Sequence, residues 1–178
     1  TGPGEHDLDR LLQQVTNHAI GLVGAERGLI VVVNDDGDVV AHTARDSKGE
    51  ETHQSFSRSV ADRVIKEGEP VISTSAKDDE RLKQAVSVHQ LMIQSIACVP
   101  IRGAPPAGKT IGALYVETRL RPGVRFREEL PTLAAFADQA AIAIESARLL
   151  DENKRRADEL EIANKELEAA KERLADAL

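Results

Sequence analysis

Aromatic residues and cysteines are scarce in this sequence. Tryptophan is absent, and aromatic residues make up 2% of the 178 positions, as Phe56, Tyr115, Phe126 and Phe136. A hydrophobic core must therefore be built from Val, Ile, Leu and Ala, which disfavours an aromatic cage around a ligand. The single cysteine, Cys98, excludes an internal disulfide and favours a reducing compartment.

Two further absences narrow the class of protein. The chain holds 23 Lys and Arg against 30 Asp and Glu, a net charge of −7, whereas a nucleic-acid surface needs clustered cations in excess. No apolar run approaches the roughly 18 residues of a membrane span, and no charged and then apolar leader opens the sequence. We therefore expect a cytoplasmic protein whose chain binds neither nucleic acid nor membrane directly.

The length suits one domain, and the residue pattern divides the chain into three parts. Residues 1–7 contain glycine and proline and are predicted to be a linker or an expression remnant. Residues 8–150 are predicted to form the folded domain, and residues 151–178 a helical extension.

Helix and strand patterns alternate within the predicted domain. Helical spacing of apolar residues runs from Leu8 to Val23, and a second helix with Ser57 and Ser59 as capping candidates ends at Gly68. A third helical pattern follows Asp78 and reaches Met92. The predicted strands are 29–33 and 39–44, joined by an Asp-Gly turn, then 71–73, 94–101 and 110–117.

The helical pattern that starts near Glu128 continues to the last residue. No Gly or Pro occurs between Thr132 and Leu178, and Pro131 falls in the first turn, where proline is tolerated. A helix of about 50 residues would be about 75 Å long, so its distal half must protrude from a small domain.

The protruding part has coiled-coil periodicity. Leu160, Leu167 and Leu174 are spaced by seven residues and predict the seam of a homodimer. Two heptad registers fit: the leucines at position a with Ala163 and its equivalents at d, or the leucines at d with Asn164 and its equivalents at a.

Four stretches of sequence resemble the GAF family of small-molecule sensory domains. They are Ser59–Val71, Gln94–Ile101, Ile111–Glu117, and Phe126 with the helix Leu133–Ala147. The order of the predicted elements is also similar to that of the family. The resemblance covers about residues 8–150 and implies an α+β, PAS-related fold with a central antiparallel sheet of about six strands flanked by helices, followed here by the long coiled-coil helix.

The subfamily most similar to this sequence is the N-terminal sensory segment of bacterial sigma-54-dependent transcriptional regulators. Sensor histidine kinases use similar connecting helices and are the alternative. Either resemblance implies a downstream output domain, to which the C-terminal helix would pass a signal. No phosphate-binding Gly-x-x-x-x-Gly-Lys-Ser/Thr loop is present in these 178 residues.

Few side chains are candidates for chemistry. If a ligand cavity exists, Phe56, Ser73, His89 and Ser95 are the predicted lining residues. Cys98 lies between apolar residues of a strand, where a thiol is usually inert, and His89 has no second ligand at zinc-like spacing.

Other patterns are better explained by ordinary surface roles. The arginines at 119, 121, 125 and 127 could grip an anion, although solvation of a loop explains them more simply. The end of the cyclic-nucleotide motif is echoed by residues 126–129, but the rest of that motif is missing. We therefore expect no catalytic residue, no metal and no haem.

Two functions follow from these observations. The first is a regulatory sensory domain, in which an unidentified small-molecule effector changes the packing of the C-terminal helix. The second is a structural dimerisation module without a ligand, which pairs through its N- and C-terminal helices. Both predict a homodimer and neither predicts an enzyme.

Overall fold

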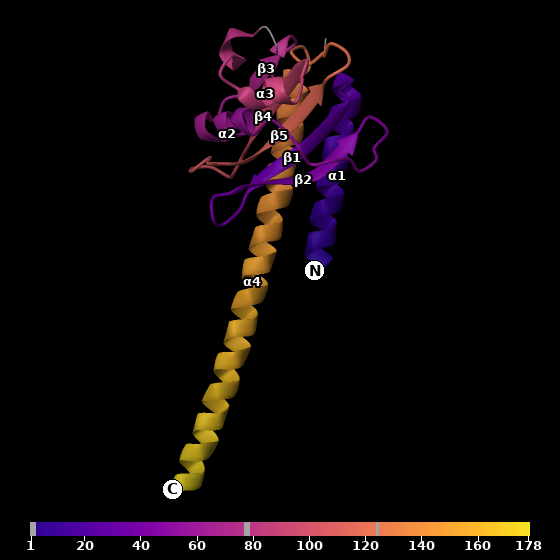
Figure 1. The fold of residues 1–178 in the computed structure, drawn as a ribbon. Coiled ribbons are helices and arrows are strands. Elements are labelled where there is room, and N and C mark those ends of the chain that lie inside the picture. The colour runs from indigo at the N-terminus through magenta and orange to yellow at the C-terminus, as the bar shows by residue number, and fades with distance from the viewer. Residues whose placement is uncertain (1–2, 77–78, 124) are drawn as a thin grey trace.

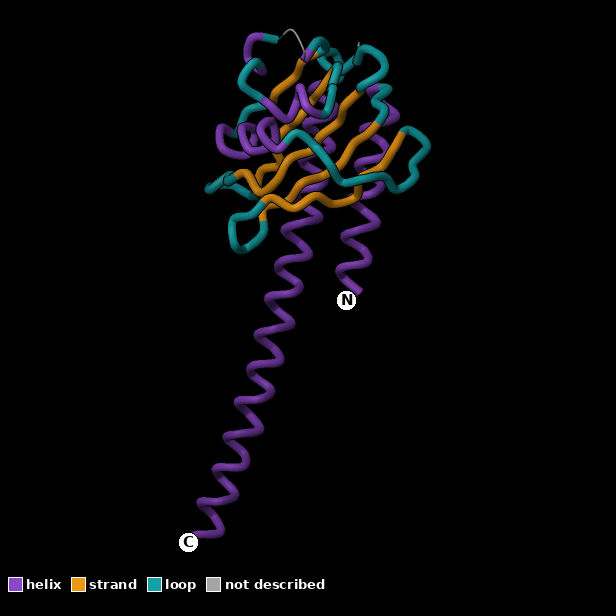
Figure 2. Tube along the Cα trace, in the orientation of Figure 1, coloured by secondary structure: helices purple, strands orange, loops and turns teal. Residues whose placement is uncertain are grey.

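A computed structural model describes residues 3–76, 79–123 and 125–178. Its elements are the helices and strands of one α+β domain with a long terminal helix (Figures 1 and 2). They are, in chain order, α1 (Pro3–Val23), β1 (Arg27–Val33), β2 (Val39–Asp46), α2 (Arg58–Glu67), β3 (Val71–Ser73), the 3-10 helix η2 (Glu80–Leu82), α3 (Val86–Gln90), β4 (Ser95–Arg102), β5 (Thr110–Thr118) and α4 (Leu130–Ala177).

The five strands form one antiparallel sheet in the order β2-β1-β5-β4-β3. The sheet confirms the predicted antiparallel architecture, but over the residues that the structure describes it has five strands where the resemblance implied about six. Between β2 and α2 the described chain forms only an isolated bridge, from Arg45 to Glu51. The carbonyls of His53 and Ser55 in this segment accept hydrogen bonds from the Arg27 side chain.

Each face of the sheet carries its own apolar cluster because side chains alternate along a strand. Helices α1 and α4 cover one face, where the buried residues include Ile30, Leu114 and Phe126. Helices α2 and α3 cover the other face, over Leu29 and Tyr115. Figure 1 shows the two pairs of helices on opposite sides of the sheet. Burial on both faces explains the unbroken apolar run of β1.

The ends of α2 follow the predicted signals. The Ser57 side chain caps the helix by accepting from the backbone N–H of Val60 at 3.4 Å. Gly68 ends it in the left-handed conformation, with φ +70°, which glycine adopts at no steric cost.

Two helices differ from their predictions. Helix α1 begins at Pro3, so residues 3–7, predicted as a linker, are helical. The single helix predicted after Asp78 is instead the separate short helices η2 and α3, and Asp78 itself lies outside the described residues. Asp79 caps η2 by accepting a hydrogen bond from the backbone N–H of Arg81. Met92, two residues after the end of α3, has a positive φ of 55°.

Helix α4 is continuous for 48 residues, without a break near residue 150. Its first part packs on the sheet through Leu133, Ala137, Ala140, Ala141 and Ile144, which are all buried. From Asn153 onward every residue is exposed, and Figure 2 shows this part extending away from the body. The predicted protruding helix is therefore confirmed.

Candidate functional site

A buried ion pair occupies one end of the sheet, on the face that α2 and α3 cover. Arg27 of β1 and Glu117 of β5 lie directly opposite each other in the ladder, and Arg27 Nη1 contacts Glu117 Oε1. Their side chains are 7% and 1% exposed, so both charges are almost wholly removed from water. Burial lowers the pKa of Arg27, and the neighbouring Glu117 carboxylate counteracts this effect. The attraction between the two charges offsets the cost of removing each of them from water.

The same arginine holds the segment between β2 and α2 over the end of the sheet. Arg27 Nη2 donates to the carbonyl of His53 at 2.8 Å and also to that of Ser55. Two residues later the backbone N–H of Ser57 donates to Tyr115 Oη at 3.2 Å. Desolvation, followed by the nearby positive charges of Arg27 and Arg119, lowers the pKa of His53 and favours its neutral form.

The charges in this cluster are not paired one to one, and two of its buried oxygen atoms lack a hydrogen-bond partner in the described part of the chain. Arg119 Nη2 lies 3.4 Å from Glu117 Oε1, so two guanidinium groups share one buried carboxylate. Within the described residues, Glu117 Oε2 and Thr118 Oγ1 are buried without a hydrogen-bond partner. Buried polar atoms usually find partners, and unpaired ones are often found where a ligand, ion or water binds.

Arg119 connects this cluster to a cavity. The cavity has a volume of about 490 Å³ and lies beside α3 and the turn that follows it. It is lined by Ser75, Val88, His89, Met92, Ile93, Gln94 and Arg119. Its size is within the range of small-molecule sites, and its lining combines three apolar side chains with four polar or charged ones.

Of the four predicted lining residues, His89 is the one that lines this cavity. Ser95 is buried and fully engaged, since its Oγ donates to the carbonyl of Thr74 and accepts from the backbone N–H of Gly123, both at 2.8 Å. Ser73 is buried on β3 and hydrogen-bonds the Asp79 carboxylate. The pKa of Asp79 is lowered mainly by its hydrogen bond from the Arg81 side chain, and the Ser73 hydroxyl contributes.

Phe56, the fourth predicted residue, packs in the core. Its ring lies edge-on to that of Tyr115 with centroids 6.1 Å apart, and the Arg58 guanidinium lies over it at 5.2 Å. Phe56, Ser73 and Ser95 thus support the structure around the cavity and are not among its lining residues.

The prediction from residue type missed Arg119 and Gln94 as lining residues. The sequence signal that could have identified Arg119 was the run of loop arginines. Arg119 differs from the other three because it follows β5 directly. Its neighbours have ordinary roles: Arg121 donates to the carbonyl of Gly24, and Arg125 pairs with Glu129.

Cys98 lies in the interior of β4 and is fully buried. Burial raises the pKa of its thiol well above the usual range, so the nucleophilic thiolate is scarce at neutral pH. Among the described residues, no group of three His, Cys, Asp or Glu side chains is arranged to hold a metal ion.

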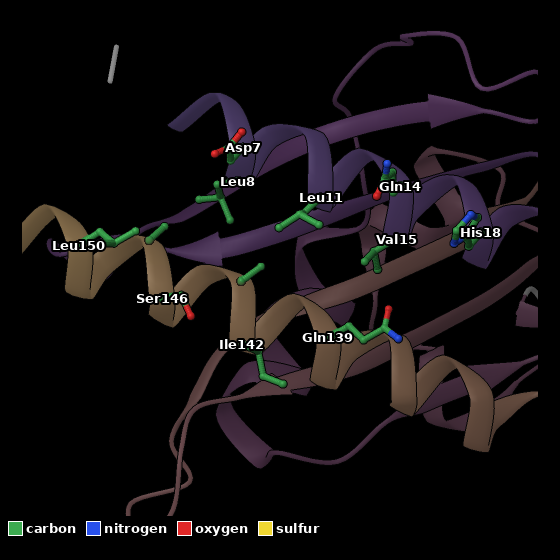
Figure 3. A pocket seen from close by; sticks show the side chains of 12 residues that line it. Asp7, Leu8, Leu11, Gln14, Val15, His18, Gln139, Ile142, Ser146 and Leu150 are labelled. Atoms are coloured by element: carbon green, nitrogen blue, oxygen red, sulfur yellow. The ribbon is translucent and has the colours of Figure 1, made fainter. Parts of the chain in front are cut away.

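A second concave surface lies between α1 and α4, and we call it the α1–α4 groove (Figure 3). Its volume is about 470 Å³. Figure 3 shows Leu8, Leu11 and Val15 projecting from α1 toward the space between the helices. The lining residues are Asp7, Leu8, Leu11, Gln14, Val15, His18, Gln139, Ile142, Ala143, Ser146, Ala147 and Leu150.

The groove exposes large apolar side chains. Leu11 is 47%, Ile142 69% and Leu150 64% exposed. Farther along α4, the predicted seam residues Leu160, Leu167 and Leu174 are 61%, 53% and 65% exposed. Contiguous apolar surface of this kind marks an interaction site more often than scattered exposed leucines do.

The ion pair leads to a stability prediction. Glu117→Gln keeps the side-chain shape but leaves Arg27 buried without a counter-charge, so we expect the free energy of unfolding to fall by about 3 kcal/mol in urea titrations. Glu128→Gln, on an exposed carboxylate, is the matched control and should change stability little. The double variant Arg27→Met/Glu117→Met should recover most of the loss. Equal stability of Glu117→Gln and the unsubstituted protein would show that the pair is not compensating a buried charge.

Comparisons with known proteins identify the family. The model of the GAF domain matches residues 5–145. No curated protein matches the sequence. None of the described helices combines the length and apolar character needed to cross a membrane.

Three solved structures illustrate the similarity. The GAF domain region of a putative membrane protein from Geobacter sulfurreducens PCA is 16% identical, with a TM-score of 0.63 over 80% of this chain and 95% of that one. The blue-light absorbing PixJ GAF domain of Thermosynechococcus elongatus is 11% identical, with a TM-score of 0.67 over 88% and 95%. A domain of a putative two-component sensor histidine kinase from Sinorhizobium meliloti 1021 is 19% identical, with a TM-score of 0.54 over 83% and 96%.

At these identities the structures establish a shared fold and do not transfer a ligand. The family match covers most of the chain, and the sheet with its flanking helices agrees with it. The chain therefore belongs to the GAF domain family.

Proposed function

We propose that this GAF domain is a regulatory module that binds a small anionic effector in the cavity beside Arg119 and passes the resulting change along α4. The observation that carries the proposal is the position of Arg119, which lines the cavity and contacts the buried Glu117.

The charge balance at the sheet end favours an anion. Arg27 and Arg119 bring two positive charges to the buried carboxylate of Glu117. The nearby Glu26 carboxylate is engaged by backbone N–H groups of residues 119–121. The Arg119 side chain is 31% exposed and can direct its remaining N–H donors to a ligand. A carboxylate or phosphate group suits the planar guanidinium, which can donate two parallel hydrogen bonds to it.

The cavity wall is connected to α4 through one short segment of chain. Arg119 lies just beyond β5, and α4 begins at Leu130. The Glu26 carboxylate accepts hydrogen bonds from the backbone N–H groups of residues 119, 120 and 121. Gly123 donates to Ser95, and Phe126 is fully buried under α4. A shift of Arg119 on binding would therefore strain the segment that fixes the start of α4.

The downstream partner that fits this arrangement is an output domain of a bacterial signalling protein in the cytoplasm. We favour a sigma-54-dependent transcriptional regulator, on the sequence resemblance of residues 8–150. A sensor histidine kinase is the alternative, and the similar fold of the Sinorhizobium meliloti domain supports it. A catalytic role is disfavoured, because the one thiol is buried and its pKa is raised.

The chain is also proposed to be a homodimer that pairs through α1 and α4. The exposed leucines of α4 and the α1–α4 groove favour this assembly, because a second copy would bury both. If the cavity binds nothing, dimerisation alone is the second candidate function.

A thermal-shift screen tests the effector. The probes are small mono- and dicarboxylates, phosphorylated metabolites and nucleotides, each beside a neutral analogue such as its amide or ester. An anion at about 100 times its Kd stabilises by about 2.7 kcal/mol, or roughly 5–10 °C in Tm for a chain of this length. Arg119→Gln should abolish the shift, whereas Arg127→Gln, on an exposed loop arginine, should keep it.

Two results would contradict this effector class. One is that the complete panel leaves Tm unchanged. The other is that neutral analogues stabilise as well as the anions do, in the Arg119→Gln variant and in the unsubstituted protein alike.

A light-scattering measurement tests the homodimer. Replacing Leu160, Leu167 and Leu174 together with Asp places like charges along the seam, so the mass should fall from two chains to one. Ile162→Asp is the control, because this exposed residue is off the seam in both heptad registers and should leave the dimer intact. A triple variant with undiminished mass would remove the seam from the proposal.

A further inference from the structure

The groove and the distal seam lie along one line of α4. We infer that they form a single parallel interface with a second copy of this chain, in which Asn164 faces Asn164 of the partner subunit. This inference rests on the homodimer proposed above and fixes its heptad register.

The α4 residues of the groove select between the two registers. Gln139, Ala143, Ser146 and Leu150 line the groove at spacings of four, three and four residues. Continued in heptads, this series passes through Asn153, Ala157, Leu160, Asn164 and Leu167. Leu150 and Asn164 then occupy a positions, with Ser146 and Leu160 at d. The groove and the leucine seam are thus in phase, without a stutter between them.

The other register fits the groove less well. If Leu160 occupied position a, the d series would run through Ile142, Leu149 and Arg156. Ile142 lines the groove, but Leu149 does not. Two Arg156 side chains would face each other in that register, as two Lys171 side chains do at position a of the selected one. Like charges therefore burden both registers, and the groove residues decide between them.

In the selected register Arg156 moves to the edge of the interface. It occupies position g, and Glu161, five residues later, occupies position e. The g and following e positions of two parallel chains are adjacent, so Arg156 of one copy meets a glutamate of the other. Asn164 at position a pairs best with an identical residue in register, which is the known role of a lone a-position Asn.

A second copy is the occupant that covers both surfaces. None of the described residues covers α4 beyond Asn153, since every residue there is exposed. A two-fold axis along α4 places each residue opposite itself, so an identical chain matches the period from Gln139 to Leu174. Figure 1 shows the start of α1 and the tail of α4 directed to the same side of the body.

Disulfide cross-linking of the full chain tests the register. Cys98 is fully buried, so a cysteine introduced on α4 is the accessible thiol of each variant. The two matched pairs are Asn164→Cys with Ala163→Cys on the tail, and Leu150→Cys with Leu149→Cys at the groove. Leu160→Cys serves as a positive control, because it lies on the seam in both registers.

We expect Asn164→Cys and Leu150→Cys to form the cross-linked dimer at least about tenfold faster than their neighbours, since a disulfide requires Cβ atoms about 4 Å apart. Faster cross-linking at Ala163 would overturn the register. Faster cross-linking at Asn164 but not at Leu150 would overturn the continuity of groove and seam. A dimer in which Leu160→Cys does not cross-link would exclude parallel pairing.

Failure of the homodimer itself is distinguishable from these results. A single-chain mass of the unsubstituted protein in light scattering would remove the dimer, and this inference with it, before any cysteine is introduced. A chain of dimeric mass that cross-links at the wrong positions would leave the dimer standing and reject the register alone.

Discussion

The packing of the first half of α4 against the sheet is the contact on which the other features depend. Ala137, Ala140, Ala141 and Ile144 have small or branched side chains, which let the helix axis approach the sheet closely. Because no glycine or proline interrupts residues 132–178, this contact sets the direction of the whole helix. The orientation of the distal leucines is therefore decided inside the domain, many residues before the seam begins.

The other face of the sheet is filled differently at its centre and at its end. Over the centre, Leu29, Tyr115 and the residues of α2 and α3 form a continuous apolar cluster. At the end, apolar packing gives way to Arg27, Glu117 and Arg119, and the cavity lies beside the last of these. Polar groups beyond the apolar cluster would let one face stabilise the fold and also receive the proposed ligand.

The sequence predicted those features that depend on local patterns. Alternation and turn residues placed the strands within one or two residues, and the absence of helix breakers predicted α4. The family resemblance supplied the antiparallel sheet, although it implied about six strands. Within the described residues, the sheet consists of the five strands that the local patterns predicted.

The candidate site was harder to predict because it is formed by non-local contacts. Serine and histidine were selected for their chemistry, yet Ser95 uses both its donor and its acceptor within the fold. Arg119 looked like one of several loop arginines, and its role follows from the pairing of β1 with β5, which brings Arg27 and Glu117 beside it. His89 was selected in the same way, and it lines the cavity because it lies near the end of α3.

The central claim is that α4 is one rigid connection from the sheet to its distal end. The direct test is an electron-electron distance measurement between spin labels at Asp138→Cys and Glu166→Cys, with the labelled chain diluted in excess unlabelled protein. These positions are 28 residues apart, so a continuous helix predicts a narrow distribution centred near about 42 Å. A broad distribution at shorter distances would show that the helix bends or folds back, and would contradict transmission along α4.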